Sequence, residues 1–177
     1  AAVGNEPKER GNASSNIAQH TIVMAAVDVA GATPGLMEAL REALQRSLQN
    51  ERSARLACVT VMKTKRIGLD ELTDKAGESV HVKLLVQLKH WARPLVQALQ
   101  LDDPARGAGV TYQVLEAPDP ANAIVEFARR NAVDHIVMGA RSSSAMRRFL
   151  GSVSARVVAE SDCSVTVVRD MAGRGTS

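Results

Sequence analysis

Five short apolar segments of strand length recur along this chain, and segments with helical periodicity separate each from the next. In chain order, the apolar segments cover residues 21–27, 55–62, 110–116, 134–140 and 164–169. Regular alternation of such strands with amphipathic helices favours a parallel sheet that carries helices on both faces. The sequence therefore predicts an α/β fold: a doubly wound five-stranded parallel sheet of the Rossmann-like type.

The helices between these strands carry recognisable start signals. From Pro34 onward, leucines recur at helical spacing and predict an amphipathic helix that ends at about residue 49. Another helix begins at Asp119 and Pro120, because Asp119 can cap free backbone N–H groups and proline fits the first helical position. The segment VSARVVAES predicts a further short helix before the last strand.

The stretch between the second and third strands is less regular. Residues 63–81 are charged and contain two glycines, so we expect an inserted loop with mobile parts and only a short helical hint. Residues 84–99 then form one apolar stripe, in which Trp91 is interpreted as a core or interface residue. Pro94 lies within this stripe, so we expect a kink there or a break into two pieces.

Length and composition fit one domain. A chain of 177 residues with 45% hydrophobic residues can bury a full core. We expect this domain to span residues 21–170, after a disordered leader or linker at 1–20 and before a disordered tail at 171–177. The leader lacks the apolar run of a signal peptide, and no stretch approaches the roughly 18 apolar residues of a membrane span. A cytoplasmic protein is the resulting expectation.

Charge and reactive side chains argue against several classes of function. Basic residues are scattered and aromatic residues make up only 2% of the chain, which disfavours nucleic-acid binding. Cys58 and Cys163 lack a CxxC motif and are interpreted as reduced structural cysteines. The four histidines show no metal-ligand spacing. Because no nucleophile with a neighbouring base and no lysine of a phosphate-binding loop are evident, we do not expect an enzyme.

The loop after the fourth strand is the main candidate site. It begins at Gly139 and ends at Gly151, where a helix follows directly. Gly139 would allow a ligand close to the backbone, and the free N–H groups of a helix start favour phosphate oxygens. Asp28 and Val61, near the ends of the first two strands, fall on the same rim of the sheet. The alternative is that Asp28 caps the following turn and that both glycines are ordinary turn residues.

The order of elements, with AAVD at the first strand end, APDPANAIVEFARRNAVDHIVMGA and LGSVSARVVAESDCSVTVVR, resembles the universal stress protein family over residues 20–170. The resemblance implies an adenine nucleotide alpha hydrolase-like fold, usually dimeric, in ATP-binding and non-binding groups. Gly139 matches the first glycine of the ATP-binding pattern, and Gly151 with Ser152 matches its last pair. Ser142 replaces the second glycine, and its spacing to Gly151 is one residue short.

The resemblance also implies a set of contacts with ATP, accompanied by Mg²⁺. It would place Asp28 near the adenosine, Val61 against the adenine, and residues 139–141 along the ribose and phosphates. Residues 151–154 would surround the phosphates, where two serine hydroxyls add donors. The nucleotide-binding residues expected on this basis are Asp28, Val61, Gly139, Ala140, Arg141, Ser142, Gly151, Ser152, Val153 and Ser154.

Three functions remain open at this stage. The first is a stress-response or signalling protein that binds ATP without fast turnover. The second is a dimerisation or regulatory module that binds no nucleotide. GARSSSAMRRFLGSVSARVVAE resembles stress-protein domains attached to some bacterial serine/threonine kinases, so a kinase domain is a possible partner. The third is a slow ATPase or adenylyl-transfer enzyme. The resemblance also implies a homodimer through the last strand, Ser164 to Arg169, which would remove an exposed edge.

Overall fold

A five-stranded parallel sheet forms the centre of the structure, a computed structural model that describes residues 20–51, 53–64, 70–106, 109–140 and 151–170. The predicted leader at 1–19 and tail at 171–177 lie outside these residues. The strands lie in the order β3-β2-β1-β4-β5, and each neighbouring pair is parallel. Their bounds are β1 Thr21–Ala26, β2 Ala54–Lys63, β3 Gly109–Ala117, β4 His135–Gly139 and β5 Ser164–Val168.

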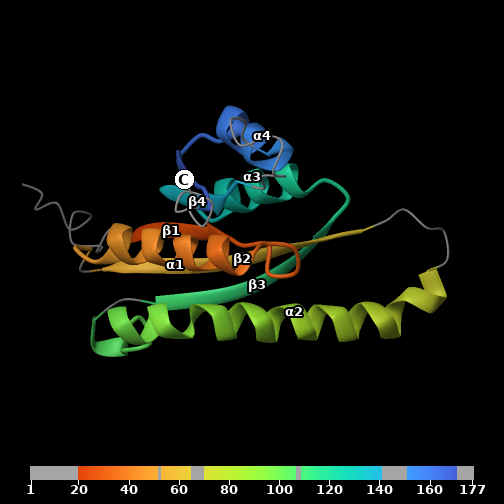
Figure 1. The fold of residues 1–177 in the computed structure, drawn as a ribbon, viewed down its shortest axis with the longest axis horizontal. Helices are drawn as coiled ribbons and strands as arrows, with labels where there is room; N and C mark the ends of the chain where they lie inside the picture. The colour runs from red at the N-terminus through yellow and green to blue at the C-terminus, as the bar shows by residue number, and fades with distance from the viewer. Residues whose placement is uncertain (1–19, 52, 65–69, 107–108, 141–150, 171–177) are drawn as a thin grey trace, which may run out of the picture.

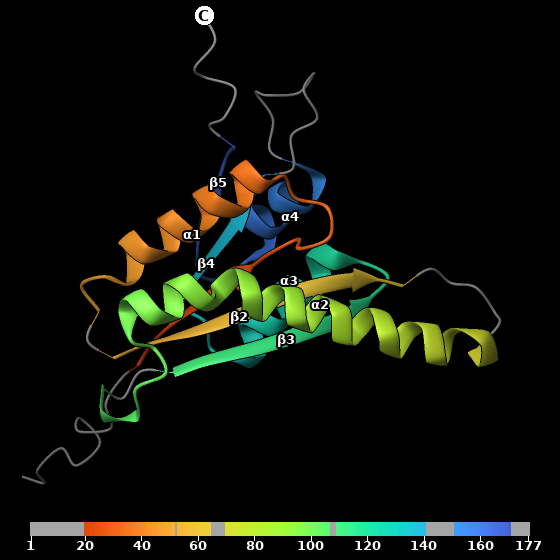
Figure 2. The ribbon, with the colours of Figure 1, turned by 60° about the horizontal axis from the view of Figure 1, so that its bottom comes forward.

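Helices cover both faces of the sheet, which confirms the predicted doubly wound α/β fold. Figure 1 shows α3 and α4 on one side of the sheet and α2 on the other. In Figure 2, α1 and α2 both lie in front of the sheet. The helices are α1 Pro34–Leu48, α2 Asp70–Leu99, α3 Pro120–Arg130 and α4 Ser152–Glu160, with a short 3₁₀ helix, η2, at Pro104–Arg106.

The position of β1 at the centre of the sheet explains why its sequence is continuously apolar. Val23 and Ala25 of β1 pack into the cluster beneath α1 and α2, whereas Met24 and Ala26 pack into the cluster beneath α3 and α4. Successive side chains of a strand point to opposite faces. A strand with helices on both sides must therefore be apolar at every position.

The predicted helix starts are confirmed. Thr33 caps α1, because its Oγ1 accepts a hydrogen bond from the N–H of Leu36 at 3.2 Å, and Pro34 follows it. Asp119 caps α3, where its Oδ1 accepts from the N–H of Asn122 at 3.5 Å. Both caps satisfy N–H groups that have no carbonyl partner within the helix.

The prediction of a loop at 63–81 is wrong for much of its length. Residues 65–69 lie outside the described residues, but the α2 helix already begins at Asp70. Helix extension adds one hydrogen bond for each residue that is ordered, so an anchored helix propagates at little cost. Gly77 opposes this extension by only about 1 kcal/mol.

Pro94 does not break α2 into two pieces, because the helix is continuous from Asp70 to Leu99. Proline removes one helical hydrogen bond and crowds the preceding turn, at a cost of about 3 kcal/mol. Trp91 and Leu95, on either side of the proline, are both buried against the sheet. Their packing keeps the two halves of the helix in one element.

Candidate functional site

The order of the strands indicates where a ligand would bind. The chain first adds β2 and β3 on one side of β1, and then returns to add β4 and β5 on the other side. In open parallel sheets, ligands bind beyond the carboxyl ends of the strands at such a reversal. The paired residues of β1 with β2 and with β4 end at Ala26. If both pairings are extended by two residues, Asp28 lies beside Val61 on one side and beside Ala140 on the other. Adjacent strands lie about 4.8 Å apart, so the sheet brings these three residues together.

Asp28 shapes the turn that leaves β1. Its Oδ1 accepts a hydrogen bond from the N–H of Gly31 at 3.0 Å, and its carbonyl accepts from the N–H of Ala32 at 2.9 Å. The turn-capping alternative from the sequence is therefore present in the structure. The side chain is also exposed, so this turn holds a carboxylate at the rim.

Val61 and Ala140 differ in what they can offer a ligand. Val61 is half-buried and packs against the cluster beneath α3 and α4. Ala140 is buried, and its N–H donates to the carbonyl of Val168 at 2.8 Å. The backbone donor of Ala140 is thus used to continue the pairing with β5, and only Val61 presents an apolar side chain at the rim.

Gly139 has a structural reason to be glycine. A Cβ atom at this position would lie 2.9 Å from Cδ2 of Leu36 on α1, closer than real Cβ atoms come to a neighbour. The close approach that the sequence analysis assigned to a ligand is therefore made by α1. The contact explains how α1 packs so near β4, and the expected contact of Gly139 with a nucleotide stays a prediction.

The start of α4 is the part of the candidate site best suited to an anion. Gly151 is the N-cap residue with φ −59° and ψ 159°, and no side chain of the described residues caps the helix there. The first N–H groups of a helix have no carbonyl partner within it, and the helix dipole makes this end positive. Because these backbone angles suit any residue, glycine leaves space here without being required by the conformation.

The residues that follow Gly151 divide into two kinds. Ser152 is exposed and Val153 is half-buried against the cluster beneath α3 and α4. Ser154 is only 2% exposed, and its hydroxyl donates to the carbonyl of Gly151 at 3.0 Å. In this structure the hydroxyl of Ser154 stabilises its own helix turn, and its expected donation to a phosphate stays a prediction. Arg141 and Ser142, the other expected contacts, lie outside the described residues.

An acidic residue that the sequence did not predict lies at the start of α1. Asp170 follows β5, and its Oδ2 accepts a hydrogen bond from Oγ1 of Thr33 at 2.6 Å. A Cβ at Gly35 would lie 2.6 Å from the same carboxylate. A carboxylate at a helix N-terminus is favourable. No sequence signal joins residues so far apart, and the contact adds a carboxylate to the cap of α1.

A second missed interaction connects α4 to α3. Nη1 of Arg156 on α4 lies 2.7 Å from Oδ1 and 2.8 Å from Oδ2 of Asp119, the cap of α3. This hydrogen bond to Arg156 lowers the pKa of the Asp119 carboxyl. Asp119 therefore both caps α3 and forms an ion pair with Arg156, which joins α3 to α4.

The remaining reactive side chains agree with a structural role. Both cysteines are free. Burial raises the pKa of Cys58 to about 12 and also raises the pKa of Cys163, so neither thiol is activated. Within the described ranges, no group of three His, Cys, Asp or Glu residues could hold a metal ion. None of the helices in the described part is long and apolar enough to cross a membrane.

The sheet order and the rim therefore define a doubly wound α/β protein with its candidate ligand site at the strand reversal. A family model described as "Universal stress protein family" matches residues 20–169. A universal stress protein of Methanothermobacter thermautotrophicus is 30% identical over 140 residues, which cover 77% of this chain and 92% of that protein. This chain belongs to the universal stress protein family.

A second relative matches over a shorter stretch. A universal stress protein of Methanocaldococcus jannaschii is 42% identical over 64 residues, which cover 36% of this chain and 37% of that protein. The aligned segment thus spans about a third of that relative.

Solved structures show the same fold. An Arabidopsis thaliana universal stress protein family protein with AMP bound has a TM-score of 0.55 at 20% identity, over 89% of this chain and 97% of that chain. A universal stress protein in complex with cAMP has a TM-score of 0.55 at 21% identity, over 85% of this chain and 98% of that chain. These similarities confirm the architecture of the sheet and its helices.

Proposed function

We propose that this chain binds an adenine nucleotide at the rim formed by β1, β2, β4 and α4, and acts in stress response or signalling without fast turnover. The observation that carries the proposal is the start of α4, where backbone N–H groups follow Gly151 and no side chain from the described part of the chain caps them. Such a helix start favours phosphate oxygens. The AMP and cAMP bound by the two structural neighbours support an adenine base.

The rim offers different chemistry to each part of the nucleotide. The exposed carboxylate of Asp28 can accept hydrogen bonds from ribose hydroxyls, and its bond to Gly31 holds it in place. Val61 offers an apolar side chain for the adenine. The phosphates would lie at Gly151, Ser152 and Val153, where the helix dipole opposes their charge.

The specific nucleotide that we propose is ATP, bound together with Mg²⁺. Mg²⁺ retains several waters and commonly binds through one or two carboxylates together with the phosphates of its ligand. A dedicated cluster of protein ligands is not needed for this arrangement. The described residues supply phosphate donors at α4, and these fit ATP as well as AMP.

The experiment compares two substitutions at one position. Gly151→Asp and Gly151→Asn both introduce a favoured N-cap residue of nearly the same shape, and the angles at Gly151 allow either. Only the aspartate places a negative charge where a phosphate would lie. Calorimetric titration with Mg-ATP, AMP and cAMP should show binding by the parent, weaker binding by Gly151→Asn, whose side-chain oxygen competes for the same N–H groups, and the weakest binding by Gly151→Asp.

Thermal unfolding of the same proteins completes the test. Both variants should be at least as stable as the parent, because each caps α4. Added nucleotide should raise the melting temperature of the parent, since a ligand that binds only the native state stabilises it. A folded parent that binds none of the three nucleotides would contradict the proposal, and so would equal binding by both variants.

Slow turnover is tested on the same material. Release of ADP from Mg-ATP should not exceed the background, in the parent or in Asp28→Ala. Product formation that Asp28→Ala abolishes would instead support the slow enzyme that the sequence left open. In that case Asp28 would take part in the reaction.

A dimerisation module without nucleotide is the second candidate, and it would suit attachment to a kinase domain. Two observations favour it: α1 occupies the space beside Gly139, and the N–H of Ala140 is already bonded to β5. Among the described strands β5 pairs only with β4, so one of its edges is available. We propose that this edge, Ser164 to Arg169, pairs with its copy in a homodimer.

Matched substitutions at the two edges of the sheet test the dimer. Thr166 lies at the middle of β5, and Thr111 lies near the start of β3 at the opposite edge; both are exposed. In a two-fold antiparallel pair of β5 strands, Thr166→Asp sets two like charges close together, which destabilises the pairing. Sedimentation at micromolar concentration should show a dimer for the parent and for Thr111→Asp, and a monomer for Thr166→Asp. A monomeric parent would contradict the dimer.

A further inference from the structure

A cavity of about 360 Å³ opens between α1 and α2, on the face of the sheet opposite α3 and α4. Its lining comes from both helices and from Val29 in the turn after β1. None of the expected nucleotide-binding residues lines it. Its volume lies within the range of small-molecule sites in proteins.

The floor of the cavity is apolar and held in place from two sides. Trp91 forms part of this floor, together with Met37, Val29 and Pro94. The indole Nε1 of Trp91 donates to the carbonyl of Met37 at 2.8 Å. In return, Nη1 of Arg41 donates to the carbonyl of Trp91 at 3.2 Å. These two hydrogen bonds join α1 to α2 at the cavity, so the floor is formed before any ligand binds.

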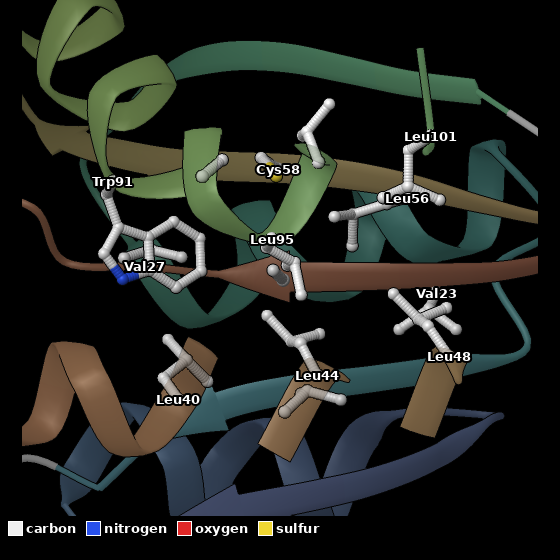
Figure 3. Close-up of a cluster of buried hydrophobic side chains, with 14 of the residues drawn as sticks. Val23, Val27, Leu40, Leu44, Leu48, Leu56, Cys58, Trp91, Leu95 and Leu101 are labelled. Carbon is white, nitrogen blue, oxygen red and sulfur yellow. The ribbon is translucent and has the colours of Figure 1, made fainter. Parts of the chain in front are cut away.

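The polar side chains of the lining are two arginines together with the neutral Gln87 and with His90. Arg41 comes from α1, and Arg93 and His90 come from α2. No acidic side chain lines the cavity, and the ion pairs among the described residues include neither arginine. Figure 3 shows the side chain of Trp91 on α2 in the same cluster as Leu40 on α1. The guanidinium groups thus lie beside an apolar surface without a counter-charge from the cavity wall.

Pro94 adds a backbone acceptor to this wall. A proline has no N–H, so the carbonyl of His90, four residues earlier, lacks its usual helical donor. His90 and Pro94 both line the cavity. A hydroxyl or water of a bound molecule can donate to this carbonyl.

We propose that this cavity binds a small organic acid with a flat apolar body, independently of the nucleotide site. A guanidinium group pairs with a carboxylate or sulfonate through two parallel hydrogen bonds and also stacks on aromatic rings. The apolar body would cover Trp91 and Met37, and the acid group would pair with Arg93 and Arg41. The charge of the lining and the apolar floor together select this class of ligand over a neutral apolar molecule.

Fluorescence of Trp91 gives a direct readout, because it is the only tryptophan of the chain. The probe is 8-anilinonaphthalene-1-sulfonate, an aromatic anion, and its matched control is N-phenyl-1-naphthylamine, which has nearly the same rings without the charge. The anion should quench Trp91 saturably at one site and bind roughly tenfold more tightly than the neutral analogue, as expected for one charge-assisted contact. Excess AMP should not displace it.

Two substitutions on α2 locate the charge that the probe recognises. Arg93→Gln should weaken binding of the anion roughly fivefold, because Arg93 is exposed and an exposed ion pair contributes little more. Lys89→Gln removes the same charge from the same helix at a residue outside the cavity and should leave the affinity within about twofold. Neither change should alter binding of the neutral analogue.

Four outcomes would overturn the proposal. These are the absence of saturable quenching, equal affinity for the charged and neutral probes, displacement of the anion by AMP, and equal effects of Arg93→Gln and Lys89→Gln. The first, second and fourth outcomes do not bear on nucleotide binding at α4, whereas displacement by AMP would show that the nucleotide competes for this cavity. Calorimetry on the Gly151 variants tests the α4 site separately.

Discussion

The two faces of the sheet are covered by different kinds of side chain. On the face of α1 and α2, leucines from both helices meet the sheet around Trp91, as Figure 3 shows. On the face of α3 and α4, the helices contribute mainly alanine and valine, among them Ala121, Ala128 and Val157. Large side chains bury more apolar area each, so the first face carries more of the hydrophobic stabilisation.

Polar contacts supplement the second face. Arg156 binds Asp119 between α4 and α3, and Arg129 on α3 lies 3.3 Å from Asp162 just after α4. Exposed ion pairs of this kind contribute little free energy but restrict geometry. The comparison teaches that the proposed nucleotide helix, α4, belongs to the more lightly packed layer. The proposed organic-acid cavity lies on the heavily packed face, where hydrogen bonds between α1 and α2 hold its floor.

Truncation of one buried residue on each face should give the largest difference in the free energy of unfolding between the two faces. Leu44 on α1 and Val157 on α4 are each 0% exposed. Leu44→Ala should lower the free energy of unfolding by about 3 kcal/mol and Val157→Ala by about 1–2 kcal/mol, from the smaller volume lost. Urea unfolding of both variants measures this. Equal losses of unfolding free energy would show that the two layers stabilise the protein equally and would contradict the difference between the faces.

The reactivity of the two cysteines tests the difference in packing between the two faces, because one cysteine lies on each face. Cys58 is 0% exposed within the cluster beneath α1 and α2, and burial raises its pKa to about 12. Cys163 is only partly buried, against the other cluster. Iodoacetamide should therefore modify Cys163 at least about 100-fold faster in the native protein, since Cys58 reacts only after unfolding.

Mass spectrometry of peptides over time measures the two rates, and Cys163→Ala isolates the signal of Cys58. Urea should bring the rates together as the protein unfolds. Comparable rates without denaturant would show that the α1 and α2 face opens as readily as the other.

The smallest expected effect on stability is that of the ion pair between Arg156 on α4 and Asp119 at the start of α3. The Arg156 guanidinium holds the pKa of the Asp119 carboxyl below its usual value. A carboxyl with a lowered pKa in the folded state adds stability above its unfolded pKa, about 3.9, and loses it as the pH falls through the folded pKa. The stability difference between the parent and Asp119→Asn should therefore be present at neutral pH and fade below about pH 4.

Asparagine keeps the capping function at this position, so the comparison isolates the charge. In an Arg156→Gln background, the pH-dependent part of the difference should be much smaller. Urea unfolding at neutral and acidic pH tests both statements. A difference that stays constant across this range would mean that the ion pair does not contribute.

Much of the fold could be predicted because its signals are local. Pro34 and Asp119 mark helix starts through capping chemistry, which depends on a few neighbouring residues. The apolar runs of β1 and β2 follow from burial on both faces. The extent of α2 could not be predicted, because the charged stretch from Asp70 has only a short helical hint and becomes helical by extension from the packed part.

The candidate site was predicted less completely. Asp28, Val61 and Gly151 lie at the rim as expected, since parallel strands end at one edge. Gly139 and Ser154 were expected to contact a nucleotide, and the structure uses them for packing and for a helix turn. The ligand contacts of all these residues stay predictions.

The order of strands and helices along the chain, the parallel sheet and the place of the helix start after Gly151 follow from the sequence alone, because periodicity and capping act over a few residues. Only the tertiary structure decided three features. It brought Asp170 to the start of α1, set Leu36 against Gly139, and formed an open pocket beside Trp91 that two arginines line. Each of these depends on residues far apart in the chain, whose distance is set by the packing of whole helices on the sheet and not by any local pattern.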